Sequence, residues 1–332
     1  MTSPWIALAV SLVLGAAGAL AVSRWGNRAG LIDVPTARSS HRQVTPKGGG
    51  IGIAAGIGFC AAVVGVPLGV WAPVLGVSLL GLAADRFDVG PGARLAAAFV
   101  LAGILLRGMD FSAWAAPSLV TVAFLAVFLV GTANFFNFMD GIDGIAGLSG
   151  VTAFVLLAWH GIFTGAEPAL TWLALGAAVA CAGFLPFNLP RARVFMGDTG
   201  SLTLGFLFAA LATAGARDFF DLACRAAFLL PFYLDELTTM AVRLRDGESL
   251  ARPHRRHLYQ LLANEMGIAH WKVSLGYATA QMAVGLGVLR MMVRGPLAVI
   301  LFLAACTIGF AAVGYRVRRA VGRLIQGGAS PL

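Results

Sequence analysis

The sequence contains few charged residues. Asp, Glu, Lys and Arg make up 12% of its 332 residues, roughly half the share in a typical soluble domain. Hydrophobic residues make up 59%, and the mean hydropathy is +0.84. This composition excludes a water-soluble globular protein with a polar shell and indicates an integral membrane protein.

Cysteines are also scarce, and their positions exclude two common structural devices. The four cysteines all fall inside apolar stretches, and no two are close in sequence. We therefore expect buried small side chains, with neither disulfides nor a cysteine metal site. No tandem repeat or low-complexity tract interrupts the sequence. We expect one integral membrane domain over residues 1–332.

Long apolar runs recur along the chain, separated by short polar connections. Their lengths suit a hydrocarbon layer about 30 Å thick, and they lack the alternation of a membrane barrel. Because spanning backbone must satisfy its own hydrogen bonds in lipid, the runs predict helices. The pattern predicts an all-α polytopic membrane protein with about eleven transmembrane helices, ten being the alternative count. The runs cover about residues 4–22, 51–66, 70–84, 95–106, 119–133, 145–163, 169–187, 202–216, 222–244, 273–293 and 296–315.

Basic residues are unevenly shared between the two sets of loops. If the chain starts outside and crosses at each run, nineteen of the 24 Lys and Arg residues lie inside. Cytoplasmic loops carry such an excess, so we expect the N-terminus outside and the first run retained as a span. The long polar segments, about residues 23–50, 188–201 and 243–272, then face the cytoplasm. Topology and anionic lipids explain the net charge of +9; we expect a bilayer partner and no nucleic acid.

The most informative polar segment lies between the fifth and sixth runs. Two asparagines three residues apart are followed by two aspartates with the same spacing, so each pair shares one face of a helix or tight turn. Carboxylates beside apolar spans are functional candidates, because burying them is costly without a cation or donors. A solvated loop with two Asp-Gly turns is the alternative. The residues are Asn134, Asn137, Asp140 and Asp143.

Two further acidic motifs lie at the ends of predicted spans. Asp198 stands between two glycines where the eighth run opens. It could cap that helix, or the glycines could let a ligand approach the backbone. Asp85 and Asp88 end the third run. Their alternative role is an ion pair with Arg86 or Arg94.

Five aspartates thus occur at the inner ends of different predicted spans, and the folded chain could bring them to one level. They are Asp85, Asp88, Asp140, Asp143 and Asp198. Such a cluster repels itself unless a cation neutralises it. Carboxylates without thiol or imidazole pairs favour Mg²⁺, with Mn²⁺ as the alternative. Since phosphate is the usual partner of Mg²⁺, we expect a phosphate-bearing substrate.

Donors for phosphate are present on the same predicted side. One segment runs from Arg252 to His257 and another from His41 to Gly50. Their guanidinium, imidazole, ammonium and exposed amide groups suit pyrophosphate recognition. His160 and His270 have no such neighbours in the sequence, and we expect them at interfaces.

These motifs resemble those of the polyprenyl-phosphate N-acetylhexosamine-1-phosphate transferases, or glycosyltransferase family 4. Residues 194–201 are similar to the family signature almost letter for letter, residues 137–144 to its second motif, and residues 45–50 to its first-loop motif. The resemblance implies transfer of a sugar-1-phosphate from a UDP-N-acetylhexosamine to undecaprenyl phosphate. UMP is released, and the product is a lipid diphosphate sugar. The expected location is the bacterial inner membrane, with the site facing the cytoplasm.

The resemblance also implies roles for individual residues. Asp198 matches the magnesium ligand, and Phe195 matches the ring that stacks on uracil. Nucleotide-sugar contacts are further implied at Asn137, Asn188, His254, Arg255, Arg256 and His257. Catalytic roles are implied for Asp85, Asp88, Asp140 and Asp143. Lipid-phosphate contacts are implied at Arg42 and Lys47.

Two details bear on the reaction. The loop of residues 253–260 is similar to that of enzymes that initiate O-antigen and capsule synthesis, which favours a simple UDP-aminosugar. Ala84, however, stands where the family usually has the first of two paired aspartates. Either the mechanism tolerates this loss, or the chain is an inactive binder of lipid phosphate or nucleotide sugar. An ion-coupled transporter that uses Asp235 and Glu236 is a third alternative. A homodimer is left open.

Overall fold

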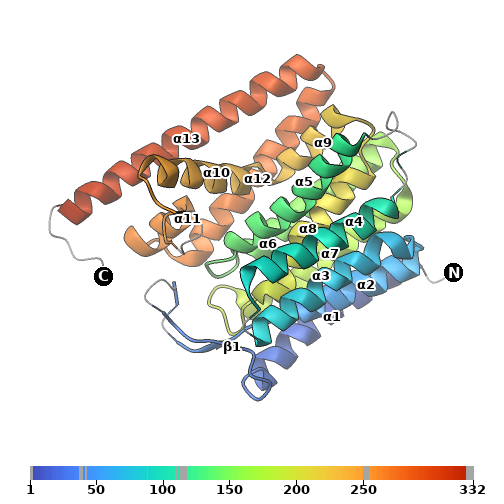
Figure 1. Cartoon of the computed structure of the whole chain (residues 1–332), viewed down its shortest axis with the longest axis horizontal. Helices are drawn as coiled ribbons and strands as arrows, with labels where there is room; N and C mark the ends of the chain where they lie inside the picture. Colours follow the sequence, from blue (N-terminus) through green and yellow to red (C-terminus); the bar gives the residue numbers. More distant parts are fainter. Residues whose placement is uncertain are drawn as a thin grey trace.

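A computed structural model describes residues 3–36, 40–41, 43–87, 89–109, 111, 118–249 and 254–326. Two predicted site residues, Arg42 and Asp88, lie outside the described residues. The described chain is helical apart from a short antiparallel hairpin of β1 (Ile32–Asp33) and β2 (Thr45–Pro46), in which Ile32 pairs with Pro46 (Figure 1).

The helices follow the predicted runs closely. The first eight are α1 (Pro4–Trp25), α2 (Ile51–Val64), α3 (Leu68–Arg86), α4 (Pro91–Arg107), α5 (Leu119–Phe138), α6 (Ile145–Thr164), α7 (Pro168–Asn188) and α8 (Gly197–Ala214). The C-terminal part contains α9 (Phe219–Ala226), the 3₁₀ turn η1 (Ala227–Leu229), α10 (Leu230–Arg245), α11 (Leu258–Gln260), the π turn η2 (Leu261–Glu265), α12 (His270–Met292) and α13 (Pro296–Gln326).

Six of the described helices are long and apolar enough to cross a membrane: α1, α3, α5, α6, α7 and α13. The all-α polytopic fold is therefore confirmed, whereas the count of eleven spans and the outside N-terminus stay predictions. The predicted run over residues 222–244 is not one helix, because η1 separates α9 from α10. Pro231 lies in the first turn of α10. Proline lacks the N–H that a continuous helix would need there, but suits the start of a new one.

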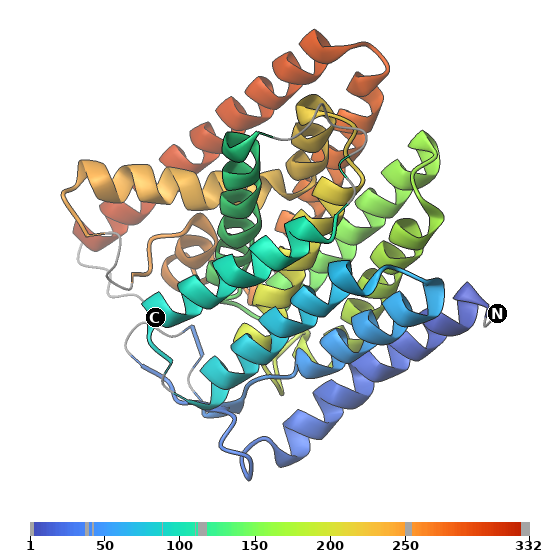
Figure 2. The same ribbon diagram turned by 45° about the vertical axis from the view of Figure 1, so that its right-hand side comes forward.

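α8 forms the centre of the bundle. Its residues from Thr199 to Thr213 are all buried, and it packs against α3 and α5. The helices α1, α2 and α7 pack against one another, and α6 contacts both α7 and α12 (Figures 1 and 2). The first turn of α8 is therefore held by the surrounding helices.

Several helix connections gather at one end of the bundle, together with the hairpin (Figure 2). We call it the hairpin end; it comprises residues 31–36, 40–41, 43–50, 139–144 and 189–196, and the ends of α3 and α8 that meet there. Hydrogen bonds join these segments, for example from the Gly49 N–H to the Phe195 carbonyl. The sequence assigned all of these segments to one side of the membrane, and the structure agrees that they share one end.

Glycines let α1 and α7 approach closely. A Cβ atom on Gly15 would lie 2.1 Å from the carbonyl oxygen of Ala180, and one on Gly183 would lie 2.1 Å from that of Leu12. Small residues at such contacts are typical of membrane helix packing, where dispersion between close backbones supplies much of the attraction.

We expect the substitution Gly15→Val to lower the free energy of unfolding by about 1–3 kcal/mol, because the added atoms must push the two backbones apart. The melting temperature of the detergent-purified protein measures this effect. Gly103→Val in α4 is the matched control, because no described atom beyond the adjoining backbone of α4 lies within 4 Å of a Cβ added there. Equal melting of the two variants would show that the α1–α7 contact tolerates the extra volume.

Candidate functional site

Asp198 lies in the first turn of α8, at the hairpin end. Its Oδ1 accepts a hydrogen bond from Asn137 Nδ2 at 2.9 Å, and its Oδ2 pairs with the guanidinium of Arg94. Asn137 Nδ2 also donates to the hydroxyl of Ser201 at 2.8 Å. The Asp198 side chain remains 27% exposed. Its carboxylate is therefore oriented by residues of α4 and α5 but still reaches solvent.

Asp85, at the end of α3, caps the start of α8. Its Oδ1 accepts the N–H of Asp198 at 3.1 Å. Its Oδ2 accepts the N–H and the hydroxyl of Thr199, at 2.9 and 2.6 Å. The first N–H groups of a helix lack partners within it and favour negative charge. Asp85 therefore fixes the direction in which α8 presents Asp198.

The glycine before Asp198 is required by this arrangement. Gly197 has a φ of +73°, and a Cβ atom there would lie 2.5 Å from Asp85 Oδ2 and 2.6 Å from the Gly48 nitrogen. Any other residue would be strained in this backbone conformation and would also displace the Asp85 carboxylate. Gly197 and Thr199, which flank Asp198 in the signature, thus both allow Asp85 to cap the start of α8.

The first-loop motif pairs with the signature motif through the backbone. The N–H groups of Gly49 and Gly50 donate to the carbonyl oxygens of Phe195 and Met196, both at 2.9 Å. The Phe195 N–H donates to the Pro46 carbonyl at 2.8 Å. The two motifs, about 150 residues apart in the chain, are therefore parts of one structure.

Two more predicted residues lie on this structure. Lys47 Nζ is 3.9 Å from Asp85 Oδ1, and the Lys47 side chain is 27% exposed. The half-buried ring of Phe195 contacts His41 edge to face, with 4.8 Å between the ring centroids. His41 was noted in the sequence only as part of a basic segment, and its contact with Phe195 had no signal there.

Asp140 lies in the connection between α5 and α6. Burial raises its pKa to about 8, assisted by the negative charges of Asp198, Asp85 and Asp143. Like charges that share a site disfavour ionisation in this way. The predicted convergence of acidic residues is therefore present for these four aspartates, which come from α3, from the connection between α5 and α6, and from α8.

Asp143 is joined to the start of α12. Its Oδ2 lies 3.3 Å from His270 Nδ1, and the Ser274 hydroxyl donates to the Asp143 carbonyl at 2.8 Å. His270 thus belongs to the site, which the sequence did not reveal. His160 is fully buried, with its Nε2 at 3.2 Å from Asp221 Oδ1.

Asn188 connects two motifs and is 6% exposed. Its Oδ1 accepts the Gly144 N–H at 2.7 Å, and its Nδ2 donates to the Val194 carbonyl at 2.9 Å. The resemblance implies a nucleotide-sugar contact for this residue. In the structure its amide holds the connection after α5 against the segment that precedes α8.

The segment that follows α10 and contains His254, Arg255, Arg256 and His257, here called the basic loop, is held by acidic residues of α10. Asp235 accepts the N–H groups of Leu258 and Tyr259, at 2.7 and 3.2 Å. His257 is buried, with Nε2 at 3.4 Å from Glu236 Oε2. Asp235 and Glu236 therefore support the loop. They were the residues that suggested an ion-coupled transporter, and this contact gives them another role.

His254, Arg255 and Arg256 of this loop are half-buried. Burial and the neighbouring His257 and Arg243 charges lower the pKa of His254 to about 4, so His254 is neutral at pH 7. Arg256 pairs with Asp246, at 2.6 Å, and with Glu248. Arg255 lies between His254 and Arg256 in the chain.

Tyr259 brings this loop to the acidic cluster. Its hydroxyl donates to the Phe138 carbonyl at 3.0 Å, at the end of α5. The described predicted residues therefore gather at the hairpin end or in the loop anchored beside it. They are Lys47, Asp85, Asn137, Asp140, Asp143, Asn188, Phe195, Asp198, His254, Arg255, Arg256 and His257.

The donor atoms of this cluster fit Mg²⁺ in one specific way. Among the described residues, no three His, Cys, Asp or Glu side chains form a complete metal site. Mg²⁺ usually binds through one or two carboxylates, water and substrate phosphate, so it does not need such a site. Asp198, whose side chain is 27% exposed, would supply one such carboxylate, and the ion would share it with Arg94.

Known proteins match three quarters of the chain, and a family model covers the segment that contains the four aspartates. The family model described as Glycosyl transferase family 4 matches residues 67–216. A protein of Mycolicibacterium smegmatis named decaprenyl-phosphate N-acetylglucosaminephosphotransferase is 31% identical over 300 residues, covering 75% of this chain and 72% of that protein. A Mycobacterium tuberculosis protein of the same name is 38% identical over 113 residues, covering 30% and 28%.

A second group of relatives matches a shorter segment. A Bifidobacterium longum protein named phospho-N-acetylmuramoyl-pentapeptide-transferase is 60% identical over 50 residues, which are 15% of this chain and 14% of that protein. The chain therefore aligns with under a third of the Mycobacterium tuberculosis relative and a seventh of the Bifidobacterium one. The Mycolicibacterium match is long enough to decide the family. The chain belongs to the polyprenyl-phosphate N-acetylhexosamine-1-phosphate transferases of glycosyl transferase family 4.

Proposed function

We propose that this protein transfers an N-acetylhexosamine-1-phosphate from a UDP-aminosugar to undecaprenyl phosphate and releases UMP. One observation carries the proposal: four aspartates from the end of α3, the connection between α5 and α6, and the start of α8 come together beside a basic loop. The names of the relatives, which specify phosphosugar transfer to a polyprenyl phosphate, support the reaction class. The undecaprenyl carrier and the UDP-aminosugar rest on the motif resemblance.

The proposed reaction is a direct displacement. An oxygen of the lipid phosphate attacks the β-phosphorus of the UDP-sugar, and the bond from that phosphorus to the bridging oxygen breaks. UMP leaves with the bonding electrons, and the sugar stays on the phosphoryl group that is transferred. Mg²⁺, when bound, neutralises the diphosphate. Catalysis of such a transfer consists mainly of positioning and electrostatic stabilisation.

Different residues of the chain would bind the metal ion, the uracil base and the departing UMP. Asp198 would hold the ion, in the orientation set by Asp85 and Asn137. The Phe195 ring would stack on the uracil base. The basic loop would offset negative charge on the departing UMP, and the neutral His254 could donate one hydrogen bond to it.

The loss of the first paired aspartate does not prevent this chemistry. A phosphate monoester has its second pKa near 6, so most of the lipid phosphate is already dianionic at pH 7. A general base contributes about 10²- to 10⁴-fold where it is needed. Ala84 therefore lowers the rate without removing the reaction. We place the site on the cytoplasmic face of the bacterial inner membrane, where it would start a cell-surface glycan.

Ala84 also supports a second candidate, a binding protein without activity. An assay of UMP release separates the two candidates. Purified protein is mixed with UDP-GlcNAc, undecaprenyl phosphate and Mg²⁺, in parallel with the substitution Ala84→Asp. We expect both proteins to release UMP, with a faster rate for Ala84→Asp. Release by Ala84→Asp alone would establish the inactive binder instead, and a panel of UDP-aminosugars would define the donor.

A further inference from the structure

The last helix, α13, extends beyond the apolar layer. It has 31 residues and is therefore about 46 Å long, whereas its first twenty residues, 296–315, already suffice for a bilayer. The next eight residues carry four arginines, and no acidic residue follows Glu265 in the sequence. Only 11% of the most apolar 18-residue stretch of α13 is buried in the protein. The apolar part of α13 is therefore mostly exposed on the outside of the protein, and the helix is strongly basic at one end.

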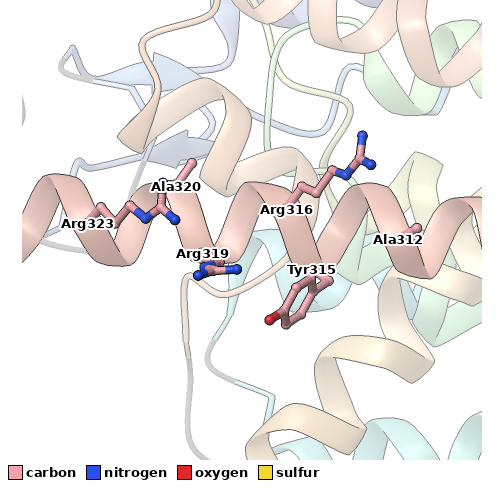
Figure 3. A pocket seen from close by; sticks show the side chains of 6 residues that line it. All are labelled: Ala312, Tyr315, Arg316, Arg319, Ala320 and Arg323. Carbon is pink, nitrogen blue, oxygen red and sulfur yellow. The ribbon is translucent and has the colours of Figure 1, made fainter.

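Six residues of this end form an open groove, which we call the arginine groove (Figure 3). Its cavity volume is about 420 Å³. Spacings of three and four residues place the three arginines on successive turns of α13, with Ala320 between the last two. The residues are Ala312, Tyr315, Arg316, Arg319, Ala320 and Arg323.

The fourth arginine fixes the groove in place. Arg318 points the other way, donating from Nη1 to the Arg256 carbonyl at 2.7 Å and from Nη2 to the Thr239 hydroxyl at 2.9 Å. The groove therefore lies at the same end of the protein as the basic loop, but on the outer side of α13. Arg316, Arg319 and Arg323 are exposed, and no described acidic side chain pairs with them.

We propose that the arginine groove binds the headgroup of an anionic bilayer phospholipid. Three guanidinium groups without acidic partners complement a phosphate, to which arginine can donate two hydrogen bonds at once. The groove begins where the apolar part of α13 ends, at the depth of the headgroups. Tyr315 is 65% exposed at this boundary, a position where tyrosine rings commonly lie in membranes. The outward direction favours a lipid of the surrounding bilayer over the acceptor lipid of the reaction.

The test measures lipid retained by the full-length protein in a neutral detergent. Native mass spectrometry follows bound dioleoyl-phosphatidylglycerol and dioleoyl-phosphatidylcholine for the wild type and for the triple substitution Arg316→Gln, Arg319→Gln and Arg323→Gln. Each basic residue near an anionic membrane surface is worth about fivefold in binding. We expect the triple substitution to weaken phosphatidylglycerol binding by about 100-fold, and to leave the weak phosphatidylcholine binding unchanged.

A matched control lies at the opposite end of the protein. Arg290 and Arg294 line a separate cavity of about 340 Å³ with Trp159 and Phe163, so Arg290→Gln with Arg294→Gln removes two positive charges elsewhere, against three in the triple variant. This control should keep the wild-type affinity. Without lipid, the wild type, the triple variant and the control variant should have equal melting temperatures. Phosphatidylglycerol should raise the melting temperature of the wild type and the control variant but not that of the triple variant.

Three results would overturn the proposal. Equal loss in the triple and control variants would mean that net charge, and not the groove, attracts the lipid. Displacement of phosphatidylglycerol by millimolar inorganic phosphate would identify a free-phosphate site. A triple variant that loses undecaprenyl phosphate but keeps phosphatidylglycerol would assign the groove to the acceptor.

Discussion

Replacing Asp198 with Asn is expected to lower the rate of UMP release by about 10³-fold, the scale of losing one main electrostatic group in an active site. The amide keeps the shape of the side chain and can still accept the hydrogen bond from Asn137. It loses the charge that would hold Mg²⁺, and its NH₂ group can face the guanidinium of Arg94. The Mg²⁺ concentration for half-maximal rate should therefore rise together with the loss of turnover.

Chelation and a control variant make this result specific. Removal of divalent ions with EDTA should stop the wild-type reaction, and added Mg²⁺ should restore it. Glu167→Gln removes one carboxylate at the far end of α7 and should leave both the rate and the Mg²⁺ requirement unchanged. Turnover by Asp198→Asn with a wild-type Mg²⁺ dependence would place the metal on other residues.

The sequence predicted the convergence of acidic residues because each motif borders an apolar run. Once the runs are helices that cross the bilayer in turn, Asp85, Asp140 and Asp198 must lie on one side. The hydrophobic pattern fixes the level of each residue along the membrane normal. It says little about lateral neighbours, so the order of helices around α8 became visible only in the structure.

The contacts that orient the site could not be predicted for this reason. Arg94 was considered as a partner of Asp85 or Asp88, yet it pairs with Asp198, 104 residues away. His270 meets Asp143 across a similar separation, because α12 packs against α6. Asp235 and Glu236 looked like isolated charges within a span. They support the basic loop because η1 and Pro231 break that span.

The second large effect concerns Asp85, and it separates two roles for that residue. As the cap of α8, its carboxylate accepts three hydrogen bonds from Asp198 and Thr199. Asp85→Asn exchanges one accepting oxygen for an NH₂ group that faces donors. We expect a loss of about 1–3 kcal/mol in the free energy of unfolding, the usual result of leaving a buried hydrogen-bonding group without its partner.

Turnover of Asp85→Asn should fall as well, because the first turn of α8 would no longer hold Asp198 in one direction. Thr199→Val is the matched partial change: it removes the hydroxyl donor and keeps the N–H bond, so both effects should be smaller. In a double-mutant cycle the two substitutions should be non-additive, since they disturb the same contact.

A residue that acts only as a proton acceptor would behave differently, with activity lost while the melting temperature is unchanged. Measured together, the melting temperature and the rate of Asp85→Asn therefore show whether Asp85 acts on the substrate itself or through Asp198.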